Sequence, residues 1–374
     1  MRACVSPIWE KSKRWYGAHP SLINVLALII SLYLFIFSLE LMGASLKMFG
    51  KEFARSLIQA TTNPIVGLFI GILSTSIIQS SSSTTSIVVG MVAGGVLEIQ
   101  SAIPIIMGAN IGTSVTNTLA SLPQISRSSE FSRAFSAATV HDFFNMLAVL
   151  VLFPIQIMTN FLGSIATLMG KAFQHVGGLT FLSPVKAVTK PVVHLLIKGI
   201  GIHPWILLIL SLLLLLFALK GMVSALKAIV VTKAEMWFDT ILFKTALRSF
   251  LVGLLLTVLV QSSSITTSLM VPMAGAGIVA LERIFPYTVG ANIGTTVTAI
   301  LAALVTGNLA AIIVAFSHLI FNVSGMVIWW PLKVVPIFLA RKFSLYSIRN
   351  KIIPVGYIII LFFIVPLLGI YLLR

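Results

Sequence analysis

Two short polar runs within otherwise apolar sequence carry the side chains that are best suited to ion binding. Each run begins with a glutamine and continues with three serines, Gln79 to Ser82 in the first half and Gln261 to Ser264 in the second. Hydroxyls and the free backbone N–H groups at the start of a helix suit an anion such as phosphate. Amide oxygens together with hydroxyls suit a hard cation such as sodium. The runs therefore predict a place where both kinds of ion bind.

The alternative is that these hydroxyls only bond to their own helix backbone or hold helices together, as single serines in membrane helices commonly do. In the first run, however, seven polar residues are consecutive, from Gln79 to Thr85. The cluster recurs almost entirely at 261–267. Ion binding is therefore the favoured interpretation.

Both runs belong to an internal duplication with an offset of 182 residues. Half of the positions from Gln79 to Thr116 are identical in the second copy, and Gly108 to Thr113 recur as Gly290 to Thr295. After a five-residue difference in length the register resumes and pairs His141 with His318 and Asn145 with Asn322. The glycines are equally well explained by close helix packing. The buried asparagines and threonines need partners, which predicts a role in ligand binding.

Asp142 is the one acidic residue deep within an expected span. Carboxylates inside a membrane usually serve a function. Its counterpart in the second half is Leu319, so only one half carries the extra negative charge. With Asn145 one helical turn away, Asp142 predicts a further cation site. The alternative is a carboxylate that pairs with His141 or with a distant lysine; His141 and His318 themselves are interpreted as structural.

These arguments predict two sets of ligands. The expected phosphate ligands are Ser80, Ser81, Ser82, Ser262, Ser263, Ser264, Asn110 and Asn292. The expected sodium ligands are Gln79, Gln261, Thr85, Thr113, Thr267, Thr295, Asp142 and Asn145. Sodium is expected as a co-transported ion, and neither a cofactor nor a transition metal is expected.

Composition places these residues in a lipid bilayer. Hydrophobic residues make up 58% of the 374 positions and charged residues only 9%, too few to coat a water-soluble surface. Spanning helices need about 20 apolar residues, and such stretches occur at 20–42, 102–122, 134–158, 204–219, 284–305, 309–332 and 353–373. The arms beside each polar run have about 15 residues and reach ~22 Å, short of the ~30 Å hydrocarbon core. Each pair of arms is therefore expected to form a re-entrant helical hairpin.

The expected fold is an all-α membrane protein with two inverted-topology repeats and a C-terminal span. Three full spans in each half, an odd number, invert the second half relative to the first, an arrangement common in secondary transporters. The expected division is an N-terminal segment 1–19, repeat 1 at 20–160 with its hairpin at about 64–98, a connector at 161–203, repeat 2 at 204–337 with its hairpin at about 247–282, and a C-terminal segment 338–374.

The basic residues report topology rather than nucleic-acid binding, because the 25 Lys and Arg are scattered between apolar segments. On the expected topology, 17 of them lie inside, Lys220 included, and 8 outside. This bias predicts a cytoplasmic N-terminus and a multi-pass protein of the plasma membrane, or of the inner membrane in a bacterium. The single Cys4 excludes an intrachain disulfide, a pair of metal-binding thiolates and a CxxC redox motif.

At these residues the sequence resembles the type II sodium-phosphate cotransporters, the solute carrier family that includes renal and intestinal phosphate transporters and bacterial relatives. The most specific stretches are Gln79 to Met91, Ala102 to Thr118, Ala134 to Asn145 and Gln261 to Leu304. The resemblance implies that the two hairpins meet at the membrane midplane to hold phosphate and sodium, while the half-chains alternate access.

The resemblance also implies electrogenic transport, because the electrogenic members of the family carry an aspartate where Asp142 stands. An additional sodium is then expected near Asp142 and Asn145. One departure is Ser136-Ala137-Ala138, where the animal electrogenic proteins have Ala-Gly-Ala. The animal proteins carry a large glycosylated, disulfide-bearing extracellular loop, and this chain has only a short connector without cysteine in its place. The resemblance therefore implies a minimal, prokaryotic version of the family.

The predicted function is therefore a sodium-phosphate symporter rather than an enzyme. A transporter of another small oxyanion or of a dicarboxylate, and a passive anion channel, remain alternatives because donor geometry alone separates such anions poorly. An intramembrane hydrolase is disfavoured, because it needs one serine activated by an adjacent base. Here the serine clusters are duplicated, and His141 and His318 lie on other spans.

Overall fold

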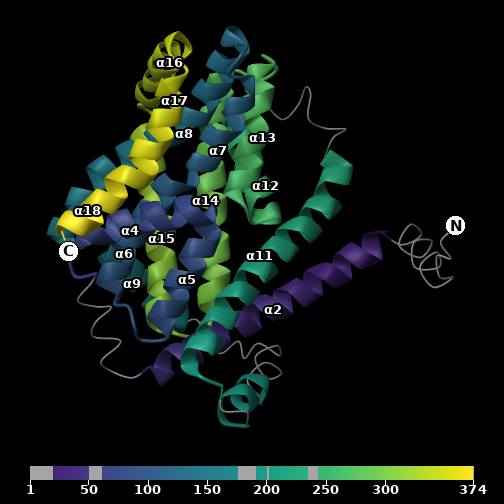
Figure 1. Ribbon diagram of the computed structural model, residues 1–374, viewed down its shortest axis with the longest axis vertical. Coiled ribbons are helices and arrows are strands. Elements are labelled where there is room, and N and C mark those ends of the chain that lie inside the picture. The colour runs from purple at the N-terminus through teal and green to yellow at the C-terminus, as the bar shows by residue number, and fades with distance from the viewer. Residues whose placement is uncertain (1–19, 50–60, 176–190, 200–201, 235–242, 374) are drawn as a thin grey trace, which may run out of the picture.

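The computed structural model describes residues 20–49, 61–175, 191–199, 202–234 and 243–373. These residues form helices and no strand (Figure 1), as expected of an all-α protein. The first half contains α2 (Pro20–Met48), α4 (Pro64–Ile78), α5 (Ser81–Ala93), α6 (Ile99–Thr113), α7 (Val115–Ser121), η1 (Leu122–Gln124), α8 (Ser128–Thr159) and α9 (Phe161–His175). The second half contains η2 (Leu195–Gly199), α11 (Pro204–Ala234), α12 (Ala246–Val260), α13 (Ser263–Gly275), α14 (Leu281–Thr306), α15 (Leu309–Trp329), α16 (Val334–Arg349), α17 (Ile352–Ile359), η3 (Ile360–Ile364) and α18 (Val365–Leu373).

Six helical segments in the described part of the chain are long and apolar enough to cross a membrane: Ile23–Leu46, Ser128–Thr159, Pro204–Gly221, Leu281–Thr306, Leu309–Trp329 and Ile352–Leu373. The expected span at 102–122 is not among them, because a break at Ser114 divides it into α6 and α7. There the hydroxyl of Ser114 donates to the carbonyl of Ile111 at 2.7 Å, and its N–H bonds to the same oxygen at 3.3 Å. This local bonding competes with the regular helical pattern. In the second half, α14 continues through the same register without a break.

Closely packed glycines join α4 to α6 and α12 to α14. A Cβ atom at Gly71 would overlap the backbone carbonyl of Ile105, and one at Gly108 would overlap that of Leu68. The second half repeats both contacts, at Gly253 against Tyr287 and at Gly290 against Phe250. Small residues allow such close approach of helix backbones in membranes. Close packing, one of the two interpretations open for these glycines, is therefore present.

Alanine at Gly108 should destabilise the protein by about 1–3 kcal/mol, because α4 and α6 must separate to admit the methyl group. Gly356→Ala is the matched control, since nothing lies within 4 Å of a Cβ at that position. There, alanine should be neutral or should stabilise the helix by up to about 1 kcal/mol. Thermal unfolding of both variants in detergent tests the prediction, and equal melting temperatures would contradict it.

Two large hydrophobic clusters hold most of the described helices together. One joins α4, α6, α7, α8, α9, α13, α14, α15, α16, α17 and η3, and the other joins α2 and α11 to α5, α6, α14 and α15. Figure 1 shows α2 and α11 side by side as a diagonal pair along one flank of the bundle.

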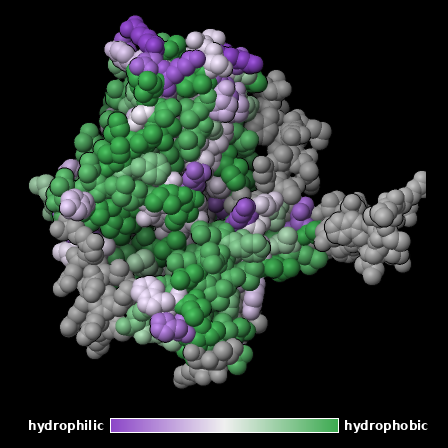
Figure 2. Space-filling view, viewed as in Figure 1, coloured by the Kyte–Doolittle hydropathy of each residue, from purple (hydrophilic) through white to green (hydrophobic). Residues whose placement is uncertain are grey.

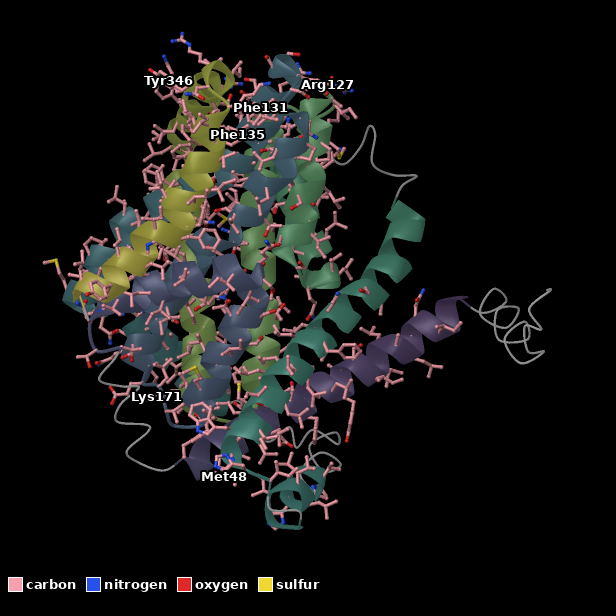
Figure 3. All side chains as sticks on the ribbon, in the orientation of Figure 1. Met48, Arg127, Phe131, Phe135, Lys171 and Tyr346 are labelled. Atoms are coloured by element: carbon pink, nitrogen blue, oxygen red, sulfur yellow. The ribbon has the colours of Figure 1, made fainter. Side chains whose placement is uncertain are left out.

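Helices α9 and α16 each pack on a helix of the other half of the chain. Helix α9 of the first half packs on α15, and α16 of the second half packs on α8. The expected connector at 161–203 therefore begins with a packed helix. Hydrophilic side chains gather at the end of the molecule where Arg127 and Tyr346 lie, and apolar side chains cover most of the face below them (Figures 2 and 3).

Candidate functional site

The first polar run begins where α4 ends and the chain turns sharply into α5. Gln79 adopts a left-handed conformation with φ 57°, and its N–H bonds to the carbonyl of Thr75 at 2.7 Å. Gln261 does the same at the end of α12, with φ 55° and a 2.6 Å bond to Thr257. Left-handed residues other than glycine are uncommon. The chain therefore leaves α4 and α12 through the same uncommon backbone conformation.

Serine and threonine hydroxyls then fix the start of the next helix. Ser80 is the N-cap of α5 and accepts the N–H of Ser83 at 3.2 Å, and Ser262 is the N-cap of α13. Across the turn, Thr75 donates to Thr84 at 3.0 Å, and the hydroxyls of Thr257 and Thr266 lie 2.7 Å apart. Capping side chains satisfy only some of the free N–H groups at a helix start. The first-turn N–H groups of α5 and α13 thus remain suited to an anion.

The two runs contact each other across the halves. The hydroxyl of Ser82 donates to the carbonyl of Gln261 at 3.3 Å, and that of Ser264 donates to the carbonyl of Gln79 at 3.4 Å. These contacts are equivalent under exchange of the two halves. They bring together two runs that are offset by 182 positions in the chain.

Both runs open onto one cavity of about 1000 Å³. Six of the predicted ligands line it: Gln79, Ser80, Ser82, Gln261, Ser262 and Ser264. Helix α7 contributes Thr116, Leu119 and Ala120, and α11 contributes Leu216, Leu219 and Lys220. Figure 2 shows hydrophilic residues in a hollow near the middle of the otherwise apolar face. The side-chain oxygen Oε1 of Gln261 is buried and has no hydrogen-bond partner among the described residues.

A buried chain of amides and one imidazole lies behind the cavity and joins the two halves. Asn292 Nδ2 donates to Asn145 Oδ1 at 2.7 Å, and Asn145 Nδ2 donates to the carbonyl of Asn110 at 2.8 Å. His141 Nε2 lies 2.7 Å from Asn292 Oδ1, and its Nδ1 lies 3.0 Å from Asn117 Nδ2. The predicted ligands Asn110, Asn145 and Asn292 thus lie together, bonded mostly to one another.

The chain of contacts continues from Asn117 to the second run. Asn117 Oδ1 accepts the hydroxyls of Thr267 at 2.9 Å and of Ser268 at 3.0 Å. Helix α13, which begins in the second run, is therefore linked through Asn117 and His141 to α14 and α8. A fully bonded polar network of this kind holds its members in one arrangement.

Asp142 is fully buried and is surrounded by hydroxyls. Thr118 and Tyr357 donate to its Oδ2 at 3.1 and 2.9 Å, and the Ser114 side chain also contacts the carboxylate. Within the described ranges, Oδ1 has no hydrogen-bond partner, and the ion pairs are Arg127–Glu130 and Arg341–Glu282. An unpaired buried charge is costly. A free carboxylate oxygen beside several hydroxyls therefore suits a cation.

The residues that were expected beside Asp142, Asn145 and His141, make their hydrogen bonds to other partners. The hydrogen bonds of Asn145 go to Asn110 and Asn292, on the face of α8 that packs on α6 and α14. A cation site shared by Asn145 and Asp142 stays a prediction. The alternative pairing of Asp142 with His141 is not formed, since both nitrogens of that ring contact asparagines. The cluster around Asp142 is instead built by α7 and α17.

The other predicted ligands are not among the described residues that line the cavity. The hydroxyls of Thr113 and Thr295 donate to carbonyls of their own helices, at Ala109 and Ala291, and Thr85 donates to the carbonyl of Ser81. Ser81 and Ser263 are buried as the first residues of α5 and α13. No group of three His, Cys, Asp or Glu side chains that could hold a metal ion occurs in the described part of the chain.

Comparison with known proteins shows the family. The sequence profile of the Na+/Pi-cotransporter family matches two segments of this chain, residues 34–183 and 214–363. The chain belongs to this family. The human sodium-dependent phosphate transport protein 2B is 35% identical over 92% of this chain, and the mouse sodium-dependent phosphate transport protein 2A is 33% identical over 92%.

The chain spans 64% of the length of the human family member and 67% of the length of the mouse one. Both relatives are named as transport proteins rather than enzymes. No solved structure matches the chain. The resemblance found in the polar runs is thus confirmed at the level of the family, over two segments that contain both runs.

Proposed function

We propose that this chain is a sodium-coupled symporter of inorganic phosphate, with its ligands bound between the two glutamine-serine runs. The observation that carries the proposal is the reciprocal contact between the runs, Ser82 to Gln261 and Ser264 to Gln79, at the wall of one cavity. Membership of the Na+/Pi-cotransporter family supports the choice of ligands. The names of the relatives, sodium-dependent phosphate transport proteins, support the coupling.

Phosphate is proposed to bind at the starts of α5 and α13. There the first-turn N–H groups and the hydroxyls of Ser82 and Ser264 face the same cavity from opposite halves. Sodium is proposed to bind where acceptor oxygens are not matched by donors. Such oxygens are Gln261 Oε1 at the cavity and Asp142 Oδ1 behind it. The predicted ligand sets remain the proposal for these sites.

The two halves are proposed to be inverted repeats that alternate access across the membrane. Helices α4 and α5, and likewise α12 and α13, have 13 to 15 residues each and are too short to span the hydrocarbon core. They are proposed to be re-entrant hairpins, with the N-terminus cytoplasmic. The duplicated turns and the two family matches support the repeat. Transport is proposed to be electrogenic, with the net charge carried by a cation at Asp142.

Radiolabelled phosphate uptake into proteoliposomes tests the proposal. An inward sodium gradient should drive accumulation, an equal potassium gradient should not, and inside-negative potential should increase the sodium-driven rate. Uptake that is indifferent to sodium would indicate a passive channel. Uptake inhibited by arsenate or sulfate at lower concentrations than by unlabelled phosphate would indicate another oxyanion as the substrate.

A further inference from the structure

The cavity between the two runs has one cationic side chain among its described lining residues. Lys220 lies on α11 and is exposed, and Leu216, one helical turn earlier, lines the same cavity. Helix α11 belongs to the diagonal pair with α2 and not to either polar run (Figure 1). In the sequence this lysine counts only as a topology marker, because it lies within an apolar helix far from both runs.

Lys220 is the one protein charge that the described lining of the cavity presents to phosphate. Phosphate near neutral pH carries one to two negative charges, yet the runs offer it only neutral hydroxyls, amides and N–H groups. No acidic residue is present among the described lining residues to pair with the lysine. A positive charge in a cleft with apolar walls raises the local concentration of anions.

Three arginines of the described chain make contacts away from this cavity. Arg133 donates twice to the carbonyl of Gly275, at 3.0 and 2.7 Å. Arg341 pairs with Glu282, and Arg127 pairs with Glu130. The simplest alternative for Lys220 is a side chain that extends along apolar surface toward the lipid headgroups. Its position in the wall shared by Gln79 and Gln261 argues against that alternative.

We propose that Lys220 is a phosphate-binding residue that attracts and holds the anion in the cavity from α11. The inference rests on the proposed function and adds to it a contact from outside the two repeated hairpins. An ammonium group on a flexible stem is a compact charge that binds phosphate without fixed geometry. Binding of phosphate in the cavity then depends on the position of α11 relative to the hairpins.

The kinetic test compares Lys220→Gln with Lys220→Arg and with Lys342→Gln. Lys342 is an exposed lysine of α16 that lies over Phe338 and is not among the cavity residues. Lys220→Gln should raise the half-saturating phosphate concentration about tenfold, the loss expected for one charge-assisted contact. Maximal rate and sodium activation should change little. Lys220→Arg should retain most of the affinity, and Lys342→Gln should behave like the wild type.

A chemical test works on protein that is already folded. Lys220→Cys is introduced with Cys4→Ser, which leaves no other cysteine in the chain. A thiol reagent that adds an ammonium group should restore phosphate affinity, one that adds a sulfonate should abolish uptake, and phosphate should slow both reactions. Equal effects of the two reagents, or wild-type affinity in Lys220→Gln, would overturn the role of Lys220 while leaving the symporter proposal intact. Absence of sodium-driven phosphate uptake by the wild type would overturn both.

Discussion

Replacing Gln261 with alanine should reduce sodium-driven phosphate uptake by roughly 10- to 100-fold while leaving the protein folded. The oxygen Oε1 of this side chain is buried and has no hydrogen-bond partner in the described structure, so its removal breaks no internal bond of that atom. What is lost is a contact to an ion, which contributes about 1.5–3 kcal/mol, or roughly 10- to 100-fold in affinity. Initial uptake rates, normalised to folded protein, measure the effect.

A glycine variant at position 261 separates the loss of an ion ligand from the effect of backbone strain. Gln261 has φ 55°, a conformation that costs a residue with a Cβ atom roughly 1–2 kcal/mol. Alanine keeps the Cβ and therefore the same cost, whereas Gln261→Gly removes it. We expect Gln261→Gly to melt at a higher temperature than Gln261→Ala and to transport equally poorly.

Gln100→Ala is the matched control for loss of a glutamine side chain. Gln100 is exposed in the first turn of α6 and is not among the cavity residues. This variant should transport like the wild type. We expect Gln79→Ala and Ser81→Ala to lose uptake together with Gln261→Ala. Near-normal uptake by all three variants would show that the transported ions do not bind at the two runs.

Site residues that recur in both halves can be predicted from the sequence more reliably than site residues that occur in only one half. The runs could be found because their glutamines and hydroxyls recur 182 residues apart, and the structure brings Ser82 and Ser264 to the same cavity. Asn117 was missed, although it links His141 to Thr267. Its counterpart is Ala299. The same asymmetry that singled out Asp142 would have identified Asn117.

Tyr357 had no such signal in the sequence. It lies in α17, outside the repeated segments, and reads as one aromatic residue within an apolar span. Its contact with Asp142 joins residues 215 positions apart and arises from the packing of the C-terminal helices on the bundle. The break at Ser114 is equally hidden, because α6 and α7 form one continuous apolar stretch in the sequence. Both features depend on tertiary contacts that no local pattern records.

The second large effect is expected at Asp142, where Asp142→Asn should leave phosphate uptake in place and abolish the accompanying current. Asparagine keeps the shape of the side chain and can still accept from Thr118 and Tyr357, but it removes the negative charge. In the proposed mechanism, the cation held at Asp142 carries the net charge. Without the carboxylate, that cation is no longer held.

Uptake and current should be measured on the same proteoliposomes at imposed membrane potentials. Moving one elementary charge through 100 mV is worth about 2.3 kcal/mol, which is roughly 50-fold in the accumulation that the potential can drive. Wild-type uptake should therefore increase with inside-negative potential, and uptake by Asp142→Asn should be indifferent to it. Asp142→Gly should also lose the current, but glycine additionally removes the acceptor for two hydroxyls and weakens α8.

Tyr357→Phe is the control that changes the surroundings of Asp142 while keeping its charge. It removes the hydroxyl that donates to Oδ2 at 2.9 Å and leaves the ring in place. This variant should still produce a current. The sodium concentration that gives half-maximal uptake should shift by a few-fold, because one hydroxyl beside the carboxylate contributes about 1 kcal/mol. A voltage-dependent current in Asp142→Asn would show that the net charge is carried at another place. The buried carboxylate would then serve to hold α7 and α17 against α8 rather than to bind a cation.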